Sequence, residues 1–286
     1  ISGMVTREGK VFFITDAGIK IFNKEENLFD GYTPEGLVTY FAFTSILEDS
    51  RGDIWLGTYH GGLYRYLREE KKFKIYDARD GLANNWISTI SEDSKGNVWV
   101  GTWGGGITKF SGDDYKTYDN TNGLVDLKIR RMVEDVEGNT LIATNDHGLA
   151  IFKGEQFVSY DGDDGLADQQ VGAIIEDKGG KFWFGTNDGI SVINFDAGRR
   201  GIRSAHFNQE SNSIGNQIMF LKTDQNDNIW IGSGNNGINM YNYKTGRFEF
   251  NRVINRYIPN NAVTALDINS QNMLYAGTQS GLLYYD

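Results

Sequence analysis

Cysteine is absent from this chain of 286 residues, and proline occurs at only two positions, Pro34 and Pro259. Without a thiol, the protein can form no disulfide bond, no thiolate metal site and no cysteine nucleophile. Positive charge is scarcer than negative charge. The chain has 28 lysines and arginines and 38 aspartates and glutamates, which gives a formal net charge of −10. That balance opposes non-specific binding to nucleic acid or anionic membranes, so no nucleic-acid partner is expected, although the basic stretches 128–131 and 199–203 can form a local cationic patch. No stretch is long and apolar enough for a membrane-spanning helix.

Glycine and aromatic residues are abundant, and they recur at a fixed period. The segment "EDSKGNVWVGTWGGGITKF" at 92–110 has close copies at 48–66 and 134–152, and weaker copies along the rest of the chain. The residues equivalent to Thr102 lie 42 to 47 residues apart, at Thr15, Thr58, Thr102, Thr144, Thr186, Ser233 and Thr278. Seven copies of a unit of about 40–50 residues predict a β-propeller with four strands per blade.

One copy contains four short strands and no helical period. In the third copy, β-branched and aromatic residues predict strands at 86–91, 97–102, 107–110 and 115–118, separated by polar or glycine-rich turns. The expected fold class is all-β, a seven-bladed β-propeller with four-stranded antiparallel blades. We expect a single domain over residues 1–286, with repeats at approximately 1–42, 43–86, 87–128, 129–170, 171–217, 218–261 and 262–286.

The first and last copies of the repeat differ in the strands that they can form. Residues Ile1–Arg7 can form the first strand of the first blade, whereas the last copy stops directly after its third strand, "LLYY". The last blade is therefore expected to be incomplete within this chain, and the sequence leaves open what completes it. Because the chain also starts at Ile1 rather than methionine, we expect it to be part of a longer, multidomain polypeptide.

A large aromatic residue and a glycine lie two positions apart in the second strand of most copies. The aromatic side chain can fill the gap between splayed blades, while the bare glycine lets a neighbour's ring lie against the backbone. On this ground the residues predicted to be structural are Trp55, Trp99, Trp183, Trp230, Gly57, Gly101, Gly185 and Gly232.

A second segment follows the first in several copies, as in "FKIYDARDGLANNWISTI" (73–90), "YKTYDNTNGLVDLKIRRM" (115–132) and "FVSYDGDDGLADQQVGAI" (157–174). Together the two segments resemble the repeat of the two-component regulator propeller family, over essentially the whole chain but weakly at both ends and after residue 190. The resemblance implies the periplasmic sensor region of a hybrid two-component histidine kinase from Bacteroidetes. It further implies an oligosaccharide ligand, a second propeller and a β-sandwich domain in the same polypeptide, and it leaves a homodimer open.

Candidate ligand-binding residues come from two kinds of loop. In a propeller, the loop between the second and third strands of a blade shares a face with the loop that links consecutive blades. Aromatic rings can cover the apolar C–H faces of a sugar, while amides and carboxylates bond to its hydroxyls. The candidates on this face are Tyr59, His60, Trp86, Trp103, Arg130, Asn145, His147, Asn187, Asp188 and Asn235.

Structural roles compete with ligand binding at these positions. Asparagine and aspartate favour turns for local backbone reasons, and His60 and His147 can be ordinary surface residues. For Tyr59 and Trp103, stacking on a ligand and packing between blades are both open. The Glu-Asp pair that precedes the first turn in several copies indicates a role in building the repeat.

The sequence offers little for catalysis. The segment "DGDDG" at 161–165 lacks the ligand spacing of a calcium loop and predicts a turn, so no catalytic residue, metal or cofactor is expected. Two alternatives to a sensor remain. One is a glycan lyase or hydrolase, for which the candidate is the irregular stretch 195–216 with Arg199, Arg200, Arg203 and His206. The other is a protein-interaction scaffold with a broad exposed apolar patch.

Overall fold

The computed structural model describes residues 3–6, 10–15, 18–23, 26, 28–32, 41–194, 203–208, 214–250, 252–269 and 271–285. Within this part of the chain the predicted seven-bladed β-propeller is confirmed. Six sheets have four strands each and the seventh has three, so the last blade is incomplete among these residues, as expected. In each sheet the strands follow one another in chain order, and neighbours pair antiparallel.

The first four sheets have the following strands. They are β1 (Gly3–Val5), β2 (Val11–Thr15), β3 (Gly18–Asn23) and β4 (Leu28–Tyr32); β5 (Phe43–Glu48), β6 (Ile54–Thr58), β7 (Leu63–Leu67) and β8 (Lys72–Tyr76); β9 (Ile87–Glu92), β10 (Val98–Thr102), β11 (Ile107–Ser111) and β12 (Asp114–Tyr118); and β13 (Ile129–Glu134), β14 (Thr140–Thr144), β15 (Leu149–Lys153) and β16 (Gln156–Tyr160). The four strands predicted in the third copy are thus present, each within one residue of its expected start and end.

The last three sheets continue the pattern. Their strands are β17 (Val171–Glu176), β18 (Phe182–Thr186), β19 (Gly189–Asn194) and β20 (Arg203–Phe207); β21 (Ile218–Thr223), β22 (Ile229–Ser233), β23 (Ile238–Asn242) and β24 (Arg247–Phe250); and β25 (Val263–Ile268), β26 (Leu274–Thr278) and β27 (Gly281–Tyr285). Short helices lie in the connections, η1 (Ala78–Asp80), η2 (Asn120–Asn122), η3 (Gly162–Asp164), α2 (Arg252–Asn255) and η4 (Pro259–Asn261). Of the helices that the structure describes, none is long and apolar enough to cross a membrane.

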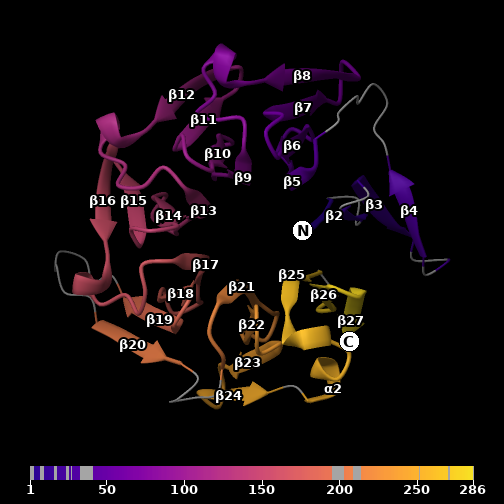
Figure 1. Cartoon of the computed structure of the whole chain (residues 1–286), viewed down its shortest axis with the longest axis vertical. Coiled ribbons are helices and arrows are strands. Elements are labelled where there is room, and N and C mark those ends of the chain that lie inside the picture. Colours follow the sequence, from indigo (N-terminus) through magenta and orange to yellow (C-terminus); the bar gives the residue numbers. More distant parts are fainter. Residues whose placement is uncertain are drawn as a thin grey trace. The chain divides into compact units, whose positions relative to one another are not determined.

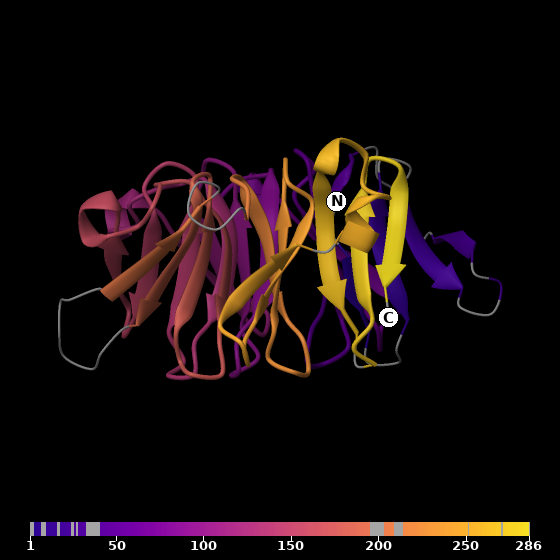
Figure 2. The same ribbon diagram turned by 90° about the horizontal axis from the view of Figure 1, so that it is seen from below.

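The chain divides into two compact units, Ile1–Glu134 with Gly154–Phe157, and Asp135–Lys153 with Val158–Asp286. In the first unit, β9 runs beside β5 and β13 runs beside β9, so that successive blades contact through their first strands. Figure 1 shows the sheets β5–β8 and β9–β12 as neighbours in this unit. In the second unit, β17, β21 and β25 succeed one another in the same way, and Figure 2 shows the sixth and seventh sheets (orange and yellow) side by side.

The predicted tryptophan packing is present between blades. The Trp55 ring, which is fully buried, lies 5.1 Å from the ring of Phe110 in the next blade and is stacked on Tyr76 of its own blade. In the second unit, Trp183 lies 4.7 Å from Tyr241 of the following blade. These large rings fill the space between neighbouring sheets.

The glycines of the second strand serve a related purpose, but the predicted partner was wrong. A Cβ atom on Gly57 would lie 2.6 Å from Cγ2 of Ile87, and one on Gly185 would lie 2.6 Å from Cγ2 of Ile218. The group against the bare backbone is therefore a β-branched aliphatic side chain from the first strand of the next blade, not an aromatic ring. The reason is geometric: the first strands of adjacent blades approach most closely, and only a compact side chain fits there. Gly101 and Gly232 meet Ile129 and Val263 in the same way.

The Glu-Asp pair builds the repeat through two separate sets of hydrogen bonds. The aspartate folds back over its own turn: Asp93 accepts the backbone N–H groups of Lys95 and Asn97 and the indole N–H of Trp99. The glutamate instead reaches the preceding blade, since Glu134 Oε2 accepts the backbone N–H of Ser94 at 2.6 Å. Equivalent bonds join Glu92 to Ser50 and Glu176 to Val136.

Candidate functional site

Backbone hydrogen bonds bring together the two kinds of loop from which the candidate site was predicted. The N–H of Gly62 donates to Asn85 O at 2.9 Å, and the N–H of Gly106 donates to Leu127 O at 3.0 Å. In the second unit the N–H of Gly148 donates to Gln169 O at 2.8 Å. In each case the loop after the second strand is tied to the loop that enters the next blade. Side chains from both loops therefore emerge on one face of the blade.

Four of the predicted residues form a continuous aromatic cluster in the first unit, which we define as Tyr59, His60, Trp86 and Trp103. The Tyr59 ring lies 4.5 Å from the ring of Trp86, and the Trp86 ring lies 5.6 Å from that of Trp103. His60 packs beside both Tyr59 and Trp86, at 4.2 and 5.2 Å. Arg130, a fifth candidate, lies next to this cluster, with its guanidinium 5.7 Å from the Trp103 ring.

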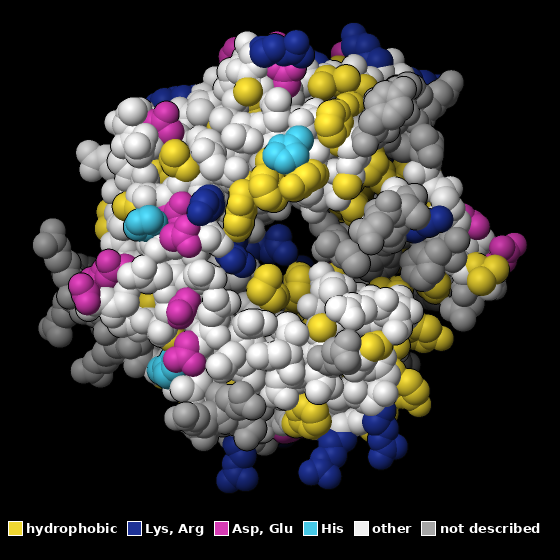
Figure 3. All heavy atoms as spheres, in the orientation of Figure 1, with side chains coloured by type: hydrophobic (Ala, Val, Ile, Leu, Met, Phe, Trp, Pro, Cys, Tyr) yellow, Lys and Arg dark blue, Asp and Glu magenta, His cyan; other side chains and the backbone are white. Residues whose placement is uncertain are grey.

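The aromatic cluster is open to solvent rather than enclosed between blades. Tyr59 is 44% exposed and His60 is also exposed, while Trp86 and Trp103 are half-buried. By contrast, the packing tryptophans Trp55 and Trp99 are 0% and 2% exposed. Figure 3 shows hydrophobic side chains gathered on the viewed face over the ends of the second and third sheets. An exposed group of large rings of this kind is typical of a binding surface.

The backbone of His60 supports a role for its side chain. His60 has a φ of +68°, in the left-handed region that costs a residue with a side chain about 1–2 kcal/mol. The equivalent residue of the next blade, two positions after the strand, is Gly104, with a φ of +115°. The loop thus tolerates glycine, which has no such cost, and His60 occupies the position in spite of the strain. Among the described residues, six others with side chains also have a positive φ, among them Lys71 and Glu155, so the conformation agrees with a role for His60 but does not assign one.

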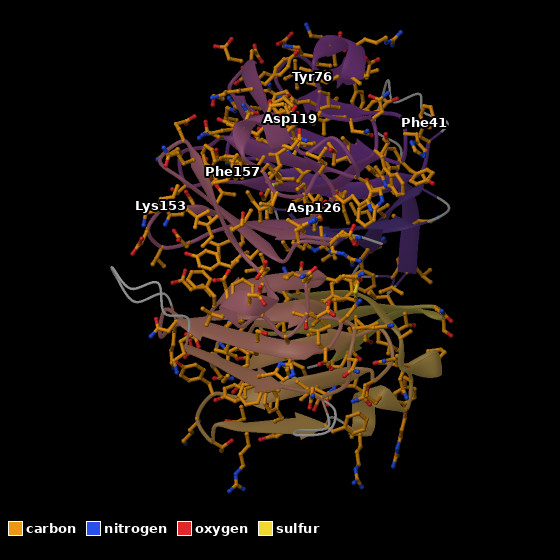
Figure 4. All side chains as sticks on the ribbon, turned by 60° about the vertical axis from the view of Figure 1, so that its left-hand side comes forward. Phe41, Tyr76, Asp119, Asp126, Lys153 and Phe157 are labelled. Carbon is orange, nitrogen blue, oxygen red and sulfur yellow. The ribbon has the colours of Figure 1, made fainter. Side chains whose placement is uncertain are left out.

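Phe41 borders the aromatic cluster and was missed from the sequence. A Cβ atom on Gly61, the residue after His60, would lie 2.3 Å from Cδ2 of Phe41, so the Phe41 ring covers that part of the loop. Phe41 is 44% exposed (Figure 4). It holds the repeat position of Asn85, a polar residue, and no aromatic pattern points to it.

The other five candidates lie in the second unit, where several make local hydrogen bonds. Asn145 is buried and its amide donates to Asp146 at 2.6 Å, while the Asn187 amide donates to Gln170 at 2.5 Å. Asp188 has a carboxylate oxygen 3.7 Å from Nε2 of His206. His147 and Asn235 are exposed. These contacts favour a turn-forming role for Asn145 and Asn187, and the ligand role of all five stays a prediction.

Two polar residues in the loops that lead into the next blade cap the turns of those loops. Asn84 Oδ1 accepts the backbone N–H of Trp86 at 2.9 Å, and Asp126 Oδ1 accepts that of Lys128 at 2.9 Å. Asp126, labelled in Figure 4, is buried. Both side chains fix the loops that lead to Trp86 and Arg130.

Three basic residues lie in or just before β13 in the first unit, and the guanidinium of one of them, Arg130, lies near Trp103. Arg130 and Arg131 are adjacent in β13, and Lys128 pairs with Trp103 through an isolated backbone bridge. Burial lowers the pKa of the Arg131 guanidinium from its ordinary value, and the charge of Arg130 lowers it further. The two like charges therefore oppose each other where water is partly excluded.

Three further sequence features concern metal binding and catalysis. Among the described residues, no group of three or more histidines, aspartates and glutamates is placed to hold a metal ion. In the segment 161–165, the Asp161 carboxylate accepts the N–H of Asp163 and caps η3, which is the turn predicted there. Of the proposed catalytic stretch, residues 195–202, with Arg199 and Arg200, and 209–213 lie outside the described residues, as does the side chain of Arg203.

A separate groove of about 570 Å³ lies in the first unit, along β7, β8 and the turn before β12. It is lined by both signs of charge, and one of its lining residues, Arg65, is 4% exposed. Arg65 bonds to Asp53 and Asp113 and lies over the Trp55 ring at 4.8 Å. Since Asp113 belongs to the next blade, this arrangement joins two blades.

Comparison with known proteins gives a family for the repeat. Residues 36–60, 81–104 and 165–188 match a family described as "Two component regulator propeller", which confirms the resemblance found in the sequence. The first and second segments contain the aromatic cluster and its loops. No curated protein matches the whole sequence closely enough to count as a relative.

Solved structures share the fold. Two are described as extracellular domains of hybrid two component systems of B. thetaiotaomicron, BT3049 (20% identity, TM-score 0.79) and BT4673 (21% identity, TM-score 0.77). Both likenesses cover 99% of this chain, but only 39% and 40% of those chains. A virginiamycin B lyase from Staphylococcus aureus is also similar, with 13% identity, a TM-score of 0.77, and coverage of 99% of this chain and 92% of the other. At these identities the likenesses show a common propeller fold.

Proposed function

We propose that this chain, a propeller built from repeats of the two-component regulator propeller family, is a non-catalytic sensor domain that binds an oligosaccharide through the aromatic cluster. The family description and the similar extracellular domains support a sensor role. The observation that carries the ligand class is the exposed row of Tyr59, Trp86 and Trp103, with His60 beside it. Flat, solvent-accessible rings with polar neighbours suit the alternating apolar and hydroxylated surface of a sugar.

In this proposal the chain belongs to a hybrid two-component system and lies outside the cytoplasm, in the periplasm of a bacterium. The similar chains are more than twice as long as this one, which supports further domains, including a second propeller and a β-sandwich, in the same polypeptide. Ligand binding would bias the packing of these domains, or of two copies, between alternative arrangements and so signal to a kinase. The blades themselves would change little.

Binding by the 286-residue chain tests the proposal. Thermal unfolding is measured against a panel of neutral and acidic plant and host oligosaccharides, because a ligand that binds only the native state raises the melting temperature. The hits are then titrated by calorimetry into the wild type, Trp103→Ala and Trp55→Phe. We expect Trp103→Ala to lose binding while retaining its fold, and Trp55→Phe, altered between blades, to bind normally.

Two outcomes would contradict the proposal. If no oligosaccharide raises the melting temperature, the ligand class is wrong, and a protein-interaction surface becomes the better explanation of the exposed rings. If a hit is consumed during long incubation, with new products in the chromatogram, the chain is an enzyme. The propeller lyase from S. aureus makes this second control necessary, since the same fold supports catalysis there.

A further inference from the structure

We infer that the ligand of the aromatic cluster is an acidic oligosaccharide, with a carboxylate or sulfate group bound by Arg130. The inference rests on the proposed function, because it names the chemical class of the ligand at the same site. Two observations support it. The Arg130 guanidinium lies next to Trp103, and the other described blades from the second onward have an uncharged residue at the position of Arg130.

Arg130 lies at one end of the aromatic cluster. Along the surface, Tyr59 contacts Trp86, Trp86 contacts Trp103, and the Arg130 guanidinium lies 5.7 Å from the Trp103 ring. Because the guanidinium lies over the Trp103 ring, a sugar that packs against the edge or the other face of this ring would bring a substituent near the guanidinium. Arginine binds carboxylate and sulfate oxygens through paired N–H groups, a geometry that sugar hydroxyls do not match.

The repeat does not require arginine at this position. In the equivalent place, the second residue of the first strand, the other described blades from the second onward carry Thr44, Ser88, Gly172, Met219 and Thr264. None of these is charged. The register between the first two strands shifts at this residue in several blades, for example between Val171 and Ala173. Irregularities of this kind change the direction of the side chain at this position of the repeat.

A second cation in the same strand strengthens the local field. Arg131 also has only uncharged counterparts in these blades, Ser45, Thr89, Ala173, Phe220 and Ala265. Burial lowers the pKa of Arg131, and the charge of Arg130 contributes, so the two cations raise each other's free energy. Lys128, two residues before Arg130, adds a third positive charge to the loop in a chain whose net charge is −10.

The test compares one sugar backbone in three charge states. The probes are a tetrasaccharide of alternating glucuronic acid and N-acetylgalactosamine, its sulfated form, and its carboxyl-reduced form, in which each acid is an alcohol. Each is titrated into the wild-type chain, Arg130→Gln and Arg130→Lys at low and at moderate ionic strength. Arg79→Gln, a change in an arginine whose side chain is 91% exposed on η1, is the matched control.

We expect at least one acidic form to bind the wild type about tenfold or more tightly than the reduced form, which is the contribution of a charge-assisted hydrogen bond. Comparison of the unsulfated and sulfated forms, which both carry carboxylates, shows whether an added sulfate strengthens binding. Arg130→Gln should remove the preference, Arg130→Lys should restore part of it, and Arg79→Gln should retain it. Added salt should weaken binding of the acidic forms more than that of the reduced form.

Equal affinity for the three forms, or binding by neutral oligosaccharides alone, would overturn the inference while leaving the proposed function in place. Binding by none of the three and by no member of the wider panel would overturn both. A preference for the acidic forms that persists in a folded Arg130→Gln chain would also overturn the assignment to Arg130. Should the Arg130 variants fail to fold, the comparison of the three probes on the wild type still decides the ligand class.

Discussion

The indole N–H of Trp99 donates a 2.9 Å hydrogen bond to Oδ2 of Asp93, six residues earlier in the chain. The same bond joins Trp55 to Asp49, Trp183 to Asp177 and Trp230 to Asp224. One aspartate therefore closes the turn and also provides the acceptor that a buried indole requires. This bond explains how a tryptophan can fill the space between blades without leaving its polar N–H unpaired.

Replacement of Asp93 by alanine should destabilise the protein by about 3 kcal/mol. The change leaves the buried Trp99 N–H and the backbone N–H groups of the turn without their acceptor, and each unsatisfied donor costs about 1–3 kcal/mol. Urea unfolding measures the free energy of unfolding. Asp114→Ala, at an exposed residue of β12, is the control and should change it by less than about 0.5 kcal/mol. Equal stability of the two variants would show that the Asp93 bonds contribute no net stability.

The glutamate of the Glu-Asp pair gives a pH-dependent prediction. Burial raises the pKa of Glu176 above its ordinary value of 4.5, although the hydrogen bond from Val136 opposes the shift. The native state therefore binds the Glu176 proton more tightly than the unfolded state, so ionisation costs stability as the pH rises through the native pKa. Glu176→Gln, which keeps an oxygen acceptor for Val136, should be slightly more stable than the wild type at pH 7, by less than about 1 kcal/mol because the group is partly exposed.

Melting curves from about pH 7 to about pH 4 test this sign. The advantage of Glu176→Gln should shrink as the pH falls, since the wild-type carboxyl becomes protonated and matches the neutral amide. The exposed variant Glu69→Gln serves as the control and should follow the wild type throughout. A constant gap between Glu176→Gln and wild type at every pH would show that ionisation of Glu176 is not the cause.

Addition of one methyl group at Gly101 should be costly. The new Cβ would lie 2.7 Å from both Cγ2 of Ile129 and Cγ2 of Thr89, so the first strand of the next blade would have to move. Gly101→Ala should destabilise the protein by about 1–3 kcal/mol, the usual range for overpacking. Gly162→Ala is the control, because no atom lies within 4 Å of the place that its Cβ would take, and its melting temperature should stay close to that of the wild type. A stable Gly101→Ala variant would mean that adjacent blades are less tightly packed than the distances indicate.

The packing of the blades was largely predictable, because hydrophobic residues and glycines recur at the repeat period. Packing roles for Trp55 and Gly57 could be predicted because tryptophan and glycine recur at the equivalent positions of other repeats. The partner of Gly57 could not, since Ile87 lies in another repeat and pairs with Gly57 only through the spacing of adjacent blades. The hydrogen bond from the Trp55 indole to Asp49 could not be predicted either. An aspartate before a turn is already explained by its hydrogen bonds to the turn backbone, so the sequence does not indicate a second partner.

The candidate site was predictable to a similar extent. Trp103 could be selected from the sequence because most other repeats have a small or polar residue at the equivalent position, such as Asn145 and Gly234, and its ring contacts that of Trp86. Phe41 was missed because nothing in its own repeat marks it, and its position depends on the chain path around Gly61. The strain at His60 was equally hidden, since a sequence shows the residue but not its φ.

A substitution at His60 is expected to lower ligand affinity without lowering the stability of the fold. Glycine adopts a φ of +68° without strain, and Gly104 holds the equivalent position of the next blade, so His60→Gly should cost the fold little and can gain about 1 kcal/mol from relief of strain. The same change removes the ring that packs on Tyr59 and Trp86, so affinity for any oligosaccharide that binds the wild type should fall by about tenfold. Thermal unfolding and calorimetric titration on the same samples measure both effects. Lys71→Gly, at another exposed residue with a positive φ (+51°) that is not a predicted ligand contact, controls for the relief of backbone strain in general. A His60→Gly variant that is less stable yet binds normally would show that the histidine serves the loop and not the ligand.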